Sequence, residues 1–242
     1  KMTMLANEQH ALNLSQGFPD FETDPKLVEL VSKAMETGHN QYAPMIGAQT
    51  LRDTISKKYR EVYNVAVDAT AELTVTSGGT QAIFTAIAAV VRPQDEVIIF
   101  EPAYDCYAPT IELFGGKVVP VRLMAPDFQI DWGYVATLIN SRTRLIIINN
   151  PNNPTGKVLG KEELIKLGDL LAGTNALLLS DEVYEHIVFD GVSPQSVLEI
   201  PSLRERSFVV ASFGKLLHTT GWKIGYCIAP PQLTQEFRKV HQ

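Results

Sequence analysis

Short apolar runs alternate along the chain with stretches in which apolar residues recur every three or four positions. The second pattern is typical of a helix packed on one side, and an unbroken run of four apolar residues is typical of a buried strand. The spacing predicts helices over residues 24–38, 47–63, 81–91, 104–114, 131–140 and 161–171. The short runs predict seven strands, over residues 73–76, 97–100, 118–121, 145–148, 176–179, 208–211 and 224–229.

Strands that alternate with helices indicate an α/β fold with a mostly parallel, seven-stranded sheet. Because the strands are apolar throughout, helices must cover both faces of this sheet. Ligands of such sheets bind just beyond the carboxyl ends of the strands, so we look for function in the residues that follow each strand.

Composition and charge restrict the class of protein. The chain has 242 residues, of which 45% are hydrophobic and 20% charged, as in ordinary globular proteins. A net charge of −6 argues against a nucleic-acid-binding surface, and no run of 18 or more apolar residues could span a membrane. The two cysteines, Cys106 and Cys227, lack metal-ligand spacing and are expected to be reduced thiols of a cytoplasmic protein.

Two lysines lie close to the last two predicted strands. Lys215 follows the apolar run 208–211, and Lys223 lies between Trp222 and Ile224. A lysine in apolar surroundings loses its proton more readily, and the neutral amine can attack a carbonyl carbon. The alternative is that both are surface lysines whose stems lie along apolar neighbours.

Two further strands are followed by residues that suit a phosphorylated, planar ligand. Gly78 and Gly79 precede a predicted helix, where backbone N–H groups and close approach favour a phosphate; a plain tight turn is the alternative. Tyr104, after strand 97–100, could stack on a flat ring or simply fill the core.

The strands at 145–148 and 176–179 are followed by an amide and a carboxylate. The first leads into a rigid turn with four asparagines, of which Asn153 could donate from its side chain, although turn formation alone also explains the composition. Asp181 follows the second and needs a cationic partner unless it caps a helix. Tyr184, three residues later, would share its face in a helical turn.

One ligand, pyridoxal 5′-phosphate, would account for all of these positions. Its groups are matched as follows: the phosphate by Gly79, Thr80, Ser212 and Lys223, the ring by Tyr104, the ring nitrogen by Asp181, the ring hydroxyl by Tyr184 and Asn153, and the aldehyde by Lys215.

These residues lie in motifs that resemble those of class I/II aminotransferases of fold type I, in the branch of the methionine and kynurenine aminotransferases. The motifs follow family order over nearly the whole chain: LSQGFPDF (14–21), NQYAPMIG (40–47), SGGTQA (77–82), EPAYDCY (101–107), PNNPTG (151–156), SDEVYEH (180–186) and SFGK…TGWKIGY (212–226). The resemblance implies transamination between an L-amino acid (methionine, aromatic or kynurenine-like) and a 2-oxo acid. It also implies a homodimer with shared sites and no nucleic-acid or membrane partner.

The resemblance also implies a role for individual residues. The catalytic residues would be Lys215, which forms the Schiff base and moves the proton, with Asp181 and Tyr184. The cofactor would contact Gly79, Thr80, Gln81, Tyr104, Asn153, Asp181, Tyr184, Ser212, Lys215, Lys223 and, from the neighbouring subunit, Tyr42. The substrate pocket would be bordered by Gln16, Gly17, Phe18 and Asn153.

The same resemblance implies a domain division and two departures. Residues 1–35 would belong to the small domain, and residues 36–242 would form the large cofactor-binding domain. The rest of the small domain and the arginine that clamps the substrate carboxylate would lie beyond Gln242, and residues would be missing before Lys1. Leu216-Leu217 also stand where relatives often carry a hydroxyl residue and an aromatic one.

Three alternatives stay open at this point. A substrate with a leaving group on its β-carbon would make the protein a cysteine-conjugate β-lyase on the same cofactor. The polypeptide alone could be a non-catalytic remnant that binds cofactor or packs against a partner. A nucleotide-binding α/β domain would explain the Gly-Gly turn, but not Lys215, Asp181 and the asparagines.

Overall fold

A computed structural model describes residues 2–14, 17 and 21–242 of the chain. The contacts divide the chain into two units, Lys1–Gln41 and Tyr42–Gln242. The smaller unit contains helices α1 (Met2–Glu8) and α2 (Pro25–Glu36). Asp24 caps α2 by accepting a hydrogen bond from the Lys26 N–H at 2.8 Å, and no residue of α2 is buried. The helix predicted over residues 24–38 is therefore present.

The larger unit contains one seven-stranded sheet, in the order β1-β7-β6-β5-β4-β2-β3. The strands are β1 (Leu73–Thr76), β2 (Glu96–Glu101), β3 (Lys117–Arg122), β4 (Thr143–Asn149), β5 (Leu177–Asp181), β6 (Ser207–Ser212) and β7 (Gly225–Ile228). Neighbouring strands are parallel except where β7 pairs with β1 and β6. Gly225 of β7 lies opposite both Thr76 and Ser212. The predicted mostly parallel sheet of seven strands is confirmed.

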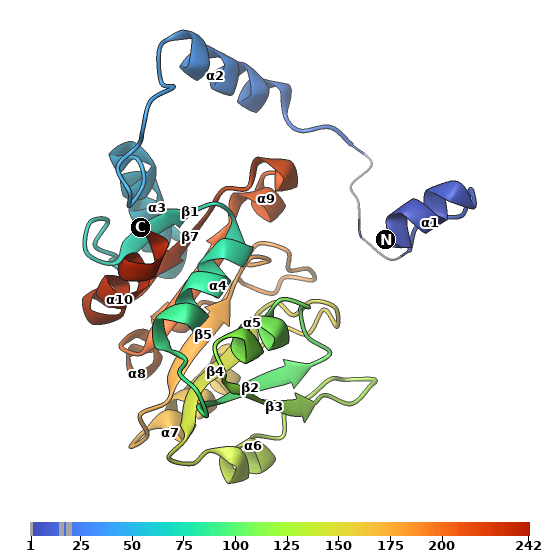
Figure 1. Cartoon of the computed structure of the whole chain (residues 1–242), viewed down its shortest axis with the longest axis vertical. Coiled ribbons are helices and arrows are strands. Elements are labelled where there is room, and N and C mark those ends of the chain that lie inside the picture. The colour runs from blue at the N-terminus through green and yellow to red at the C-terminus, as the bar shows by residue number, and fades with distance from the viewer. Residues whose placement is uncertain (1, 15–16, 18–20) are drawn as a thin grey trace. The chain divides into compact units, whose positions relative to one another are not determined.

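Helices cover both faces of this sheet, as predicted (Figure 1). They are α3 (Gln49–Tyr63), α4 (Gly79–Val90), α5 (Tyr107–Leu113), α6 (Trp132–Leu138), α7 (Lys161–Leu171), α8 (Pro201–Arg204), α9 (Phe213–Leu216) and α10 (Pro231–His241), with 3-10 turns η1 (Val197–Glu199) and η2 (Thr220–Trp222).

Successive strand residues point to opposite faces and build two separate cores. Ile98 and Ile146 pack with α3, α6 and α7 on one face. Val97 and Leu145 pack with α4, α5 and α10 on the other. The continuous apolar runs are explained by this burial on both sides, because neither face of a central strand meets water.

The helix at residues 104–114 was predicted to begin too early. Helix α5 begins at Tyr107, so Tyr104 lies in the segment that joins β2 to the helix.

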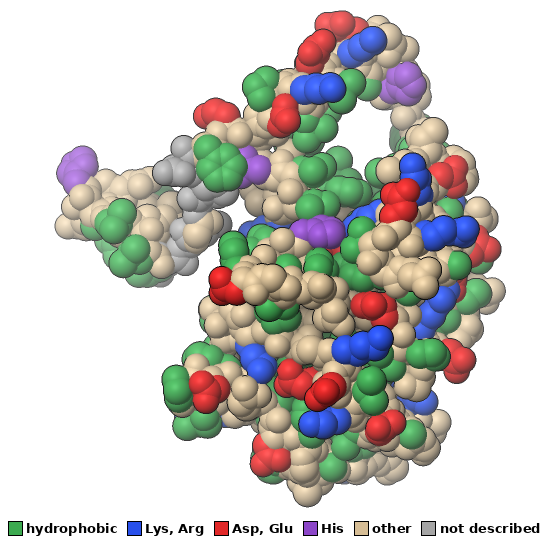
Figure 2. Space-filling view, turned by 180° about the vertical axis from the view of Figure 1, so that it is seen from behind, with side chains coloured by type: hydrophobic (Ala, Val, Ile, Leu, Met, Phe, Trp, Pro, Cys, Tyr) green, Lys and Arg blue, Asp and Glu red, His purple; other side chains and the backbone are tan. Residues whose placement is uncertain are grey.

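No helix of the described residues is long and apolar enough to cross a membrane. On the face of the described larger unit shown in Figure 2, acidic and basic side chains are interspersed among neutral ones.

Candidate active site

Asp181 is the last residue of β5 and is buried, with 2% of its surface exposed. Tyr107 donates its hydroxyl to Oδ2 at 2.5 Å, and the Val183 N–H donates to Oδ1 at 3.3 Å. Burial raises the pKa of this carboxyl from 3.8 to about 6, although both hydrogen bonds oppose the rise. No salt bridge joins Asp181 to any described residue. The carboxylate is therefore stabilised by neutral donors alone and favours a cationic partner.

The asparagine-rich turn after β4 is tied to the same strand end. Asn149 donates its side-chain amide to the Asp181 carbonyl at 2.8 Å and accepts from the Asn153 N–H at 2.7 Å. Asn150 forms side-chain hydrogen bonds with the backbone of Leu159 in both directions. These contacts leave the Asn153 side chain to donate to the Tyr184 hydroxyl at 3.3 Å. Turn chemistry thus explains most of the asparagines, and Asn153 is the one directed at the site.

Tyr184 links the asparagine turn to the lysine after β6. Burial and the nearby Asp181 raise the pKa of its phenol above 10.0, so the hydroxyl is protonated at neutral pH. Because this hydroxyl accepts from Asn153, its own proton can be donated to a ligand oxygen. Lys215 Nζ lies 5.5 Å from the centre of the Tyr184 ring. The predicted helical turn between Asp181 and Tyr184 is wrong, since Asp181 ends a strand and a turn follows.

Lys215 and Lys223 are exposed, which agrees with the alternative of surface lysines and not with apolar surroundings. Lys215 lies in the one-turn helix α9, beyond the buried part of β6. Lys223 adopts a left-handed backbone conformation, with φ of 56°, directly after η2. Both lysines are therefore placed by turns at the edge of the sheet and not by the apolar strands beside them.

The N-terminus of α4 forms a close cradle with β6 and β7. Gly78 caps the helix with φ of 86°, and a Cβ on this residue would lie 3.7 Å from the Lys223 backbone. A Cβ on Gly79 would lie 3.7 Å from Cβ of Ser212. A Cβ on Gly225 would lie only 2.6 Å from the Gly78 carbonyl carbon. A Cβ on Gly225 would overlap the backbone of Gly78 and Gly79, so the N-terminus of this twelve-residue helix, with its free N–H groups, lies directly against β7 and close to Ser212 and Lys223.

Tyr104 is placed at the rim of the cradle by Thr80. The two hydroxyl oxygens are 3.2 Å apart, and the Tyr104 ring packs edge-on against Tyr107 with centroids 5.9 Å apart. Gln81 accepts a hydrogen bond from the Ser77 N–H at 2.6 Å and so closes the turn that precedes α4. The described residues include no group of three or more His, Cys, Asp or Glu that could hold a metal ion.

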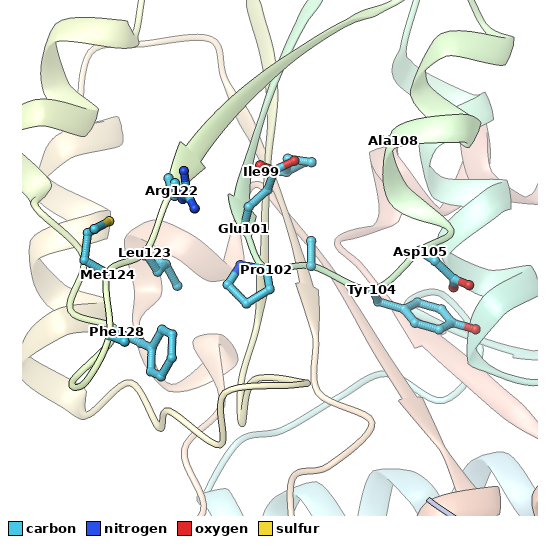
Figure 3. Close-up of a pocket in the computed structure, with 12 residues that line it drawn as sticks. Ile99, Glu101, Pro102, Tyr104, Asp105, Ala108, Arg122, Leu123, Met124 and Phe128 are labelled. Atoms are coloured by element: carbon cyan, nitrogen blue, oxygen red, sulfur yellow. The ribbon is translucent and has the colours of Figure 1, made fainter. Parts of the chain in front are cut away.

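An open cavity of about 780 Å³ adjoins Tyr104. Pro102, Leu123 and Phe128 line its apolar side, while Glu101, Asp105 and Arg122 also border it. In Figure 3 the Tyr104 ring lies on the opposite side of Pro102 from Phe128. The cavity is therefore a neighbour of the cradle, with Tyr104 on their common border.

The remaining predicted site residues are Gln16, Gly17, Phe18 and Tyr42. Tyr42 is fully exposed, with a relative exposure of 102%. Gly17 is exposed and belongs to the smaller unit. Gln16 and Phe18 lie outside the described residues. Their assignment to the substrate pocket stays a prediction, as does that of Tyr42 to a neighbouring subunit.

Sequence reasoning missed two residues that hold the site together. Tyr107 donates to the Asp181 carboxylate, and Asn149 joins the backbone of the asparagine turn to that of β5. Tyr107 could have been found, because it lies three residues after Tyr104 in the EPAYDCY motif, where a turn brings both to one side. Asn149 gave no separate signal among its neighbouring asparagines.

The described residues fit pyridoxal phosphate. A buried carboxylate without a cationic partner suits a protonated ring nitrogen, and the cradle at α4 suits a phosphate. Tyr184, whose phenol proton is available to a ligand, contacts both the Asn153 amide and the Lys215 side chain.

Comparison with known proteins gives a consistent result. The family model described as "Aminotransferase class I and II" matches residues 9–242. A methionine aminotransferase of Escherichia coli is 48% identical over 242 residues, which is 100% of this chain and 63% of the relative. Kynurenine–oxoglutarate transaminase 1 of Homo sapiens is 36% identical over 251 residues, 98% of this chain and 60% of the relative.

Solved structures agree with these relatives. A crystal structure of an Escherichia coli protein with methionine aminotransferase function has a TM-score of 0.97 and 48% identity, covering 100% of this chain and 64% of the other. N-Succinyldiaminopimelate aminotransferase from Mycobacterium tuberculosis has a TM-score of 0.96 and 37% identity, covering 100% and 63%. The chain thus spans less than two thirds of the length of these relatives.

Proposed function

Because the chain belongs to the class I and II aminotransferases, whose members use pyridoxal phosphate, we propose that the full-length protein transfers an amino group from an L-amino acid to a 2-oxo acid. The observation that carries the proposal is the buried Asp181 carboxylate. It ends strand β5, and Tyr184, three residues later, contacts Asn153 and Lys215, which would match the other groups of the cofactor.

Each residue has one task in this reaction. Asp181 would hold the proton on the ring nitrogen, so that the bound cofactor supplies an electron sink for the substrate's α-carbon. Lys215 would accept the α-proton at Nζ as general base and later donate it as general acid. Asn153 and Tyr184 would hold the ring hydroxyl, and Tyr104 would lie against the ring.

The phosphate group would be held by neighbouring elements of the sheet edge. Gly79, Thr80 and Gln81 begin α4, while Ser212 and Lys223 approach from β6 and from the segment before β7. Helix N–H groups and a lysine together stabilise a dianion. A fixed phosphate prevents rotation of the ring and so keeps Lys215 on one side of it.

Replacing Lys215 with Ala in the full-length protein tests the proposal. Wild type is expected to show the visible absorbance of cofactor linked to a lysine, and Lys215→Ala is expected to bind cofactor without that absorbance and to lose activity by at least a thousandfold. Lys166→Ala, on the surface helix α7, serves as the matched control. A Lys215→Ala protein that kept the absorbance would exclude this lysine.

We infer the substrate class and the assembly from the relatives. Relatives named for methionine and for kynurenine suggest a hydrophobic or aromatic amino acid as donor. The fully exposed Tyr42 would reach the phosphate of a second subunit in a homodimer. Both cysteines are free thiols, which favours a cytoplasmic protein. A donor panel, with pyruvate release from a cysteine conjugate measured in parallel, would separate transamination from β-elimination.

A further inference from the structure

The turn that carries Tyr184 also carries two buried carboxylates on either side of it in sequence. Glu182 has 0% of its surface exposed and Glu185 has 4%. A buried carboxylate is unfavourable unless hydrogen bonds or a cation compensate it. The partners of these two residues therefore show what determines the conformation of the turn.

Glu185 is bound by two side chains of helix α3. Lys58 of α3 forms a salt bridge with its Oε1, and Tyr63 of the same helix donates to Oε2 at 2.7 Å. Lys58 Nζ also donates to the Tyr226 hydroxyl on β7 at 3.0 Å. His186 Nε2 lies 3.9 Å from Glu185 Oε2. The turn is thus joined to α3 and, through Lys58, to β7.

Glu182 is bound on the other side of the turn. Its Oε1 accepts from the Ser180 hydroxyl at 2.8 Å and from the Val197 N–H, at the start of η1, at 3.1 Å. Burial raises the pKa of its carboxyl to about 8, although these hydrogen bonds oppose the rise. Glu182 therefore joins the turn to β5 and η1, while Glu185 joins it to α3, and these two residues form a cluster with Lys58.

The sequence position of Glu185 connects this cluster to the candidate active site. Tyr184 is its neighbour and directs its hydroxyl to Asn153, while Glu185 directs its carboxylate to α3. A side chain that fixes one residue of a tight turn also restricts the backbone of the next. The salt bridge contacts no proposed ligand group itself, so any effect on the reaction must act through Tyr184.

We propose that the Lys58–Glu185 pair is a positioning device that holds the Tyr184 hydroxyl in place for the cofactor's ring hydroxyl. This inference rests on the proposed function, because it assigns a purpose to the pair only if Tyr184 contacts that group. Lys58 is a positioning residue and not a catalytic one.

Lys58→Met in the full-length protein with bound cofactor tests the proposal, with Lys57→Met as matched control. Lys57 is the adjacent residue of α3, its side chain is 72% exposed, and within the described part of the chain its one salt bridge is to the exposed Glu61 at 3.7 Å. Loss of one positioned hydrogen bond corresponds to about a tenfold rise in the cofactor dissociation constant. A donor to an anionic oxygen favours the anion, and in Lys58→Met the Tyr184 hydroxyl would no longer be held as this donor. The midpoint of the pH titration of the cofactor's visible absorbance should therefore rise by about one unit. Lys57→Met should change neither.

Glu185→Gln provides a second variant in case Lys58→Met fails to fold. It removes the charge and retains the shape, and we expect the same direction in both measurements. Thermal unfolding of the cofactor-free proteins is followed alongside, since a purely structural pair would change stability without moving the absorbance midpoint. Lys58→Arg should restore the midpoint, because it restores the cation.

A double-mutant cycle with Tyr184→Phe shows whether the pair acts through Tyr184. In the Tyr184→Phe protein, Lys58→Met should shift the midpoint by less than a third of its shift in wild type. Equal shifts in both backgrounds would overturn the proposal, as would a Lys58→Met protein that titrates like Lys57→Met. Failure of the proposed function is a different result, in which wild type itself shows no lysine-dependent visible absorbance.

Discussion

Replacing Asp181 with Asn should make the cofactor-free protein more stable above neutral pH and should weaken cofactor binding. The carboxyl is buried, and its pKa of about 6 in the folded protein lies above the 3.8 of a solvated aspartate. Between these values the folded protein holds a proton that the unfolded chain has lost. The contribution of Asp181 to stability therefore falls as pH rises from about 4 to about 6 and is constant above that.

The size of the effect follows from the same pKa. A rise from 3.8 to about 6 corresponds to about 3 kcal/mol of destabilisation above pH 6, at about 1.4 kcal/mol per pH unit. An asparagine amide can accept from only one of the two donors, Tyr107 and Val183, and losing the other hydrogen bond costs about 1 kcal/mol. We therefore expect a net gain of about 2 kcal/mol for Asp181→Asn at about pH 8.

Urea unfolding of the two cofactor-free proteins, at one protein concentration, measures this difference across the pH range. Glu182, whose pKa is raised to about 8, changes the stability of both proteins equally and cancels in the comparison. With cofactor bound, the order should reverse, because only the carboxylate can pair with a protonated ring nitrogen. An advantage that did not change between about pH 4 and pH 8, or a less stable Asp181→Asn protein at pH 8, would refute the reasoning.

Two more substitutions follow from the site geometry. Tyr107→Phe removes the hydroxyl that donates to Asp181 at 2.5 Å, so the pKa of that carboxyl should rise by about one more unit. The pH dependence of urea unfolding should then shift to higher pH, and an unchanged profile would contradict this prediction. Gly225→Ala places a Cβ 2.6 Å from the Gly78 backbone and should destabilise the protein by about 1–3 kcal/mol while lowering cofactor affinity. Gly221→Ala, with nothing within 4 Å of its Cβ, is the control in thermal unfolding and cofactor titration; equal behaviour of the two alanines would argue against a close cradle.

The fold could be predicted from the sequence because its strands are buried on both faces. The apolar runs 97–100, 145–148 and 208–211 each lie within an observed strand. Helix boundaries were less predictable where the chain runs from a strand end into a helix. Tyr104 carries the apolar spacing of α5, but the helix begins only at Tyr107. Spacing records which side chains face the core and does not show where helical hydrogen bonding starts.

The sequence showed which types of polar residue follow each strand, but it did not show which of these residues contact one another. Asp181 stood out because a buried carboxylate is unfavourable without a partner, and Asn153 because its turn holds more asparagines than a turn requires. The structure joins Asn153 to Tyr184 and Asp181 to the backbone of the same turn. The exposed positions of Lys215 and Lys223 depend on turn geometry, which apolar neighbours in sequence do not reveal. The EPAYDCY motif could have singled out Tyr107, but its partner Asp181 is 74 positions away and could be identified only with the sheet order known.

The direction of β7 has a consequence for the evolution of this site. A strand that runs against its neighbours starts at the edge where they finish, so the chain between β6 and β7 returns as a hairpin and never leaves that edge. Lys215 and Lys223 both lie in this one connection between β6 and β7. An insertion or deletion there would displace Lys215 and Lys223 together. We therefore expect length changes among homologues to avoid this hairpin, even where its exposed side chains vary.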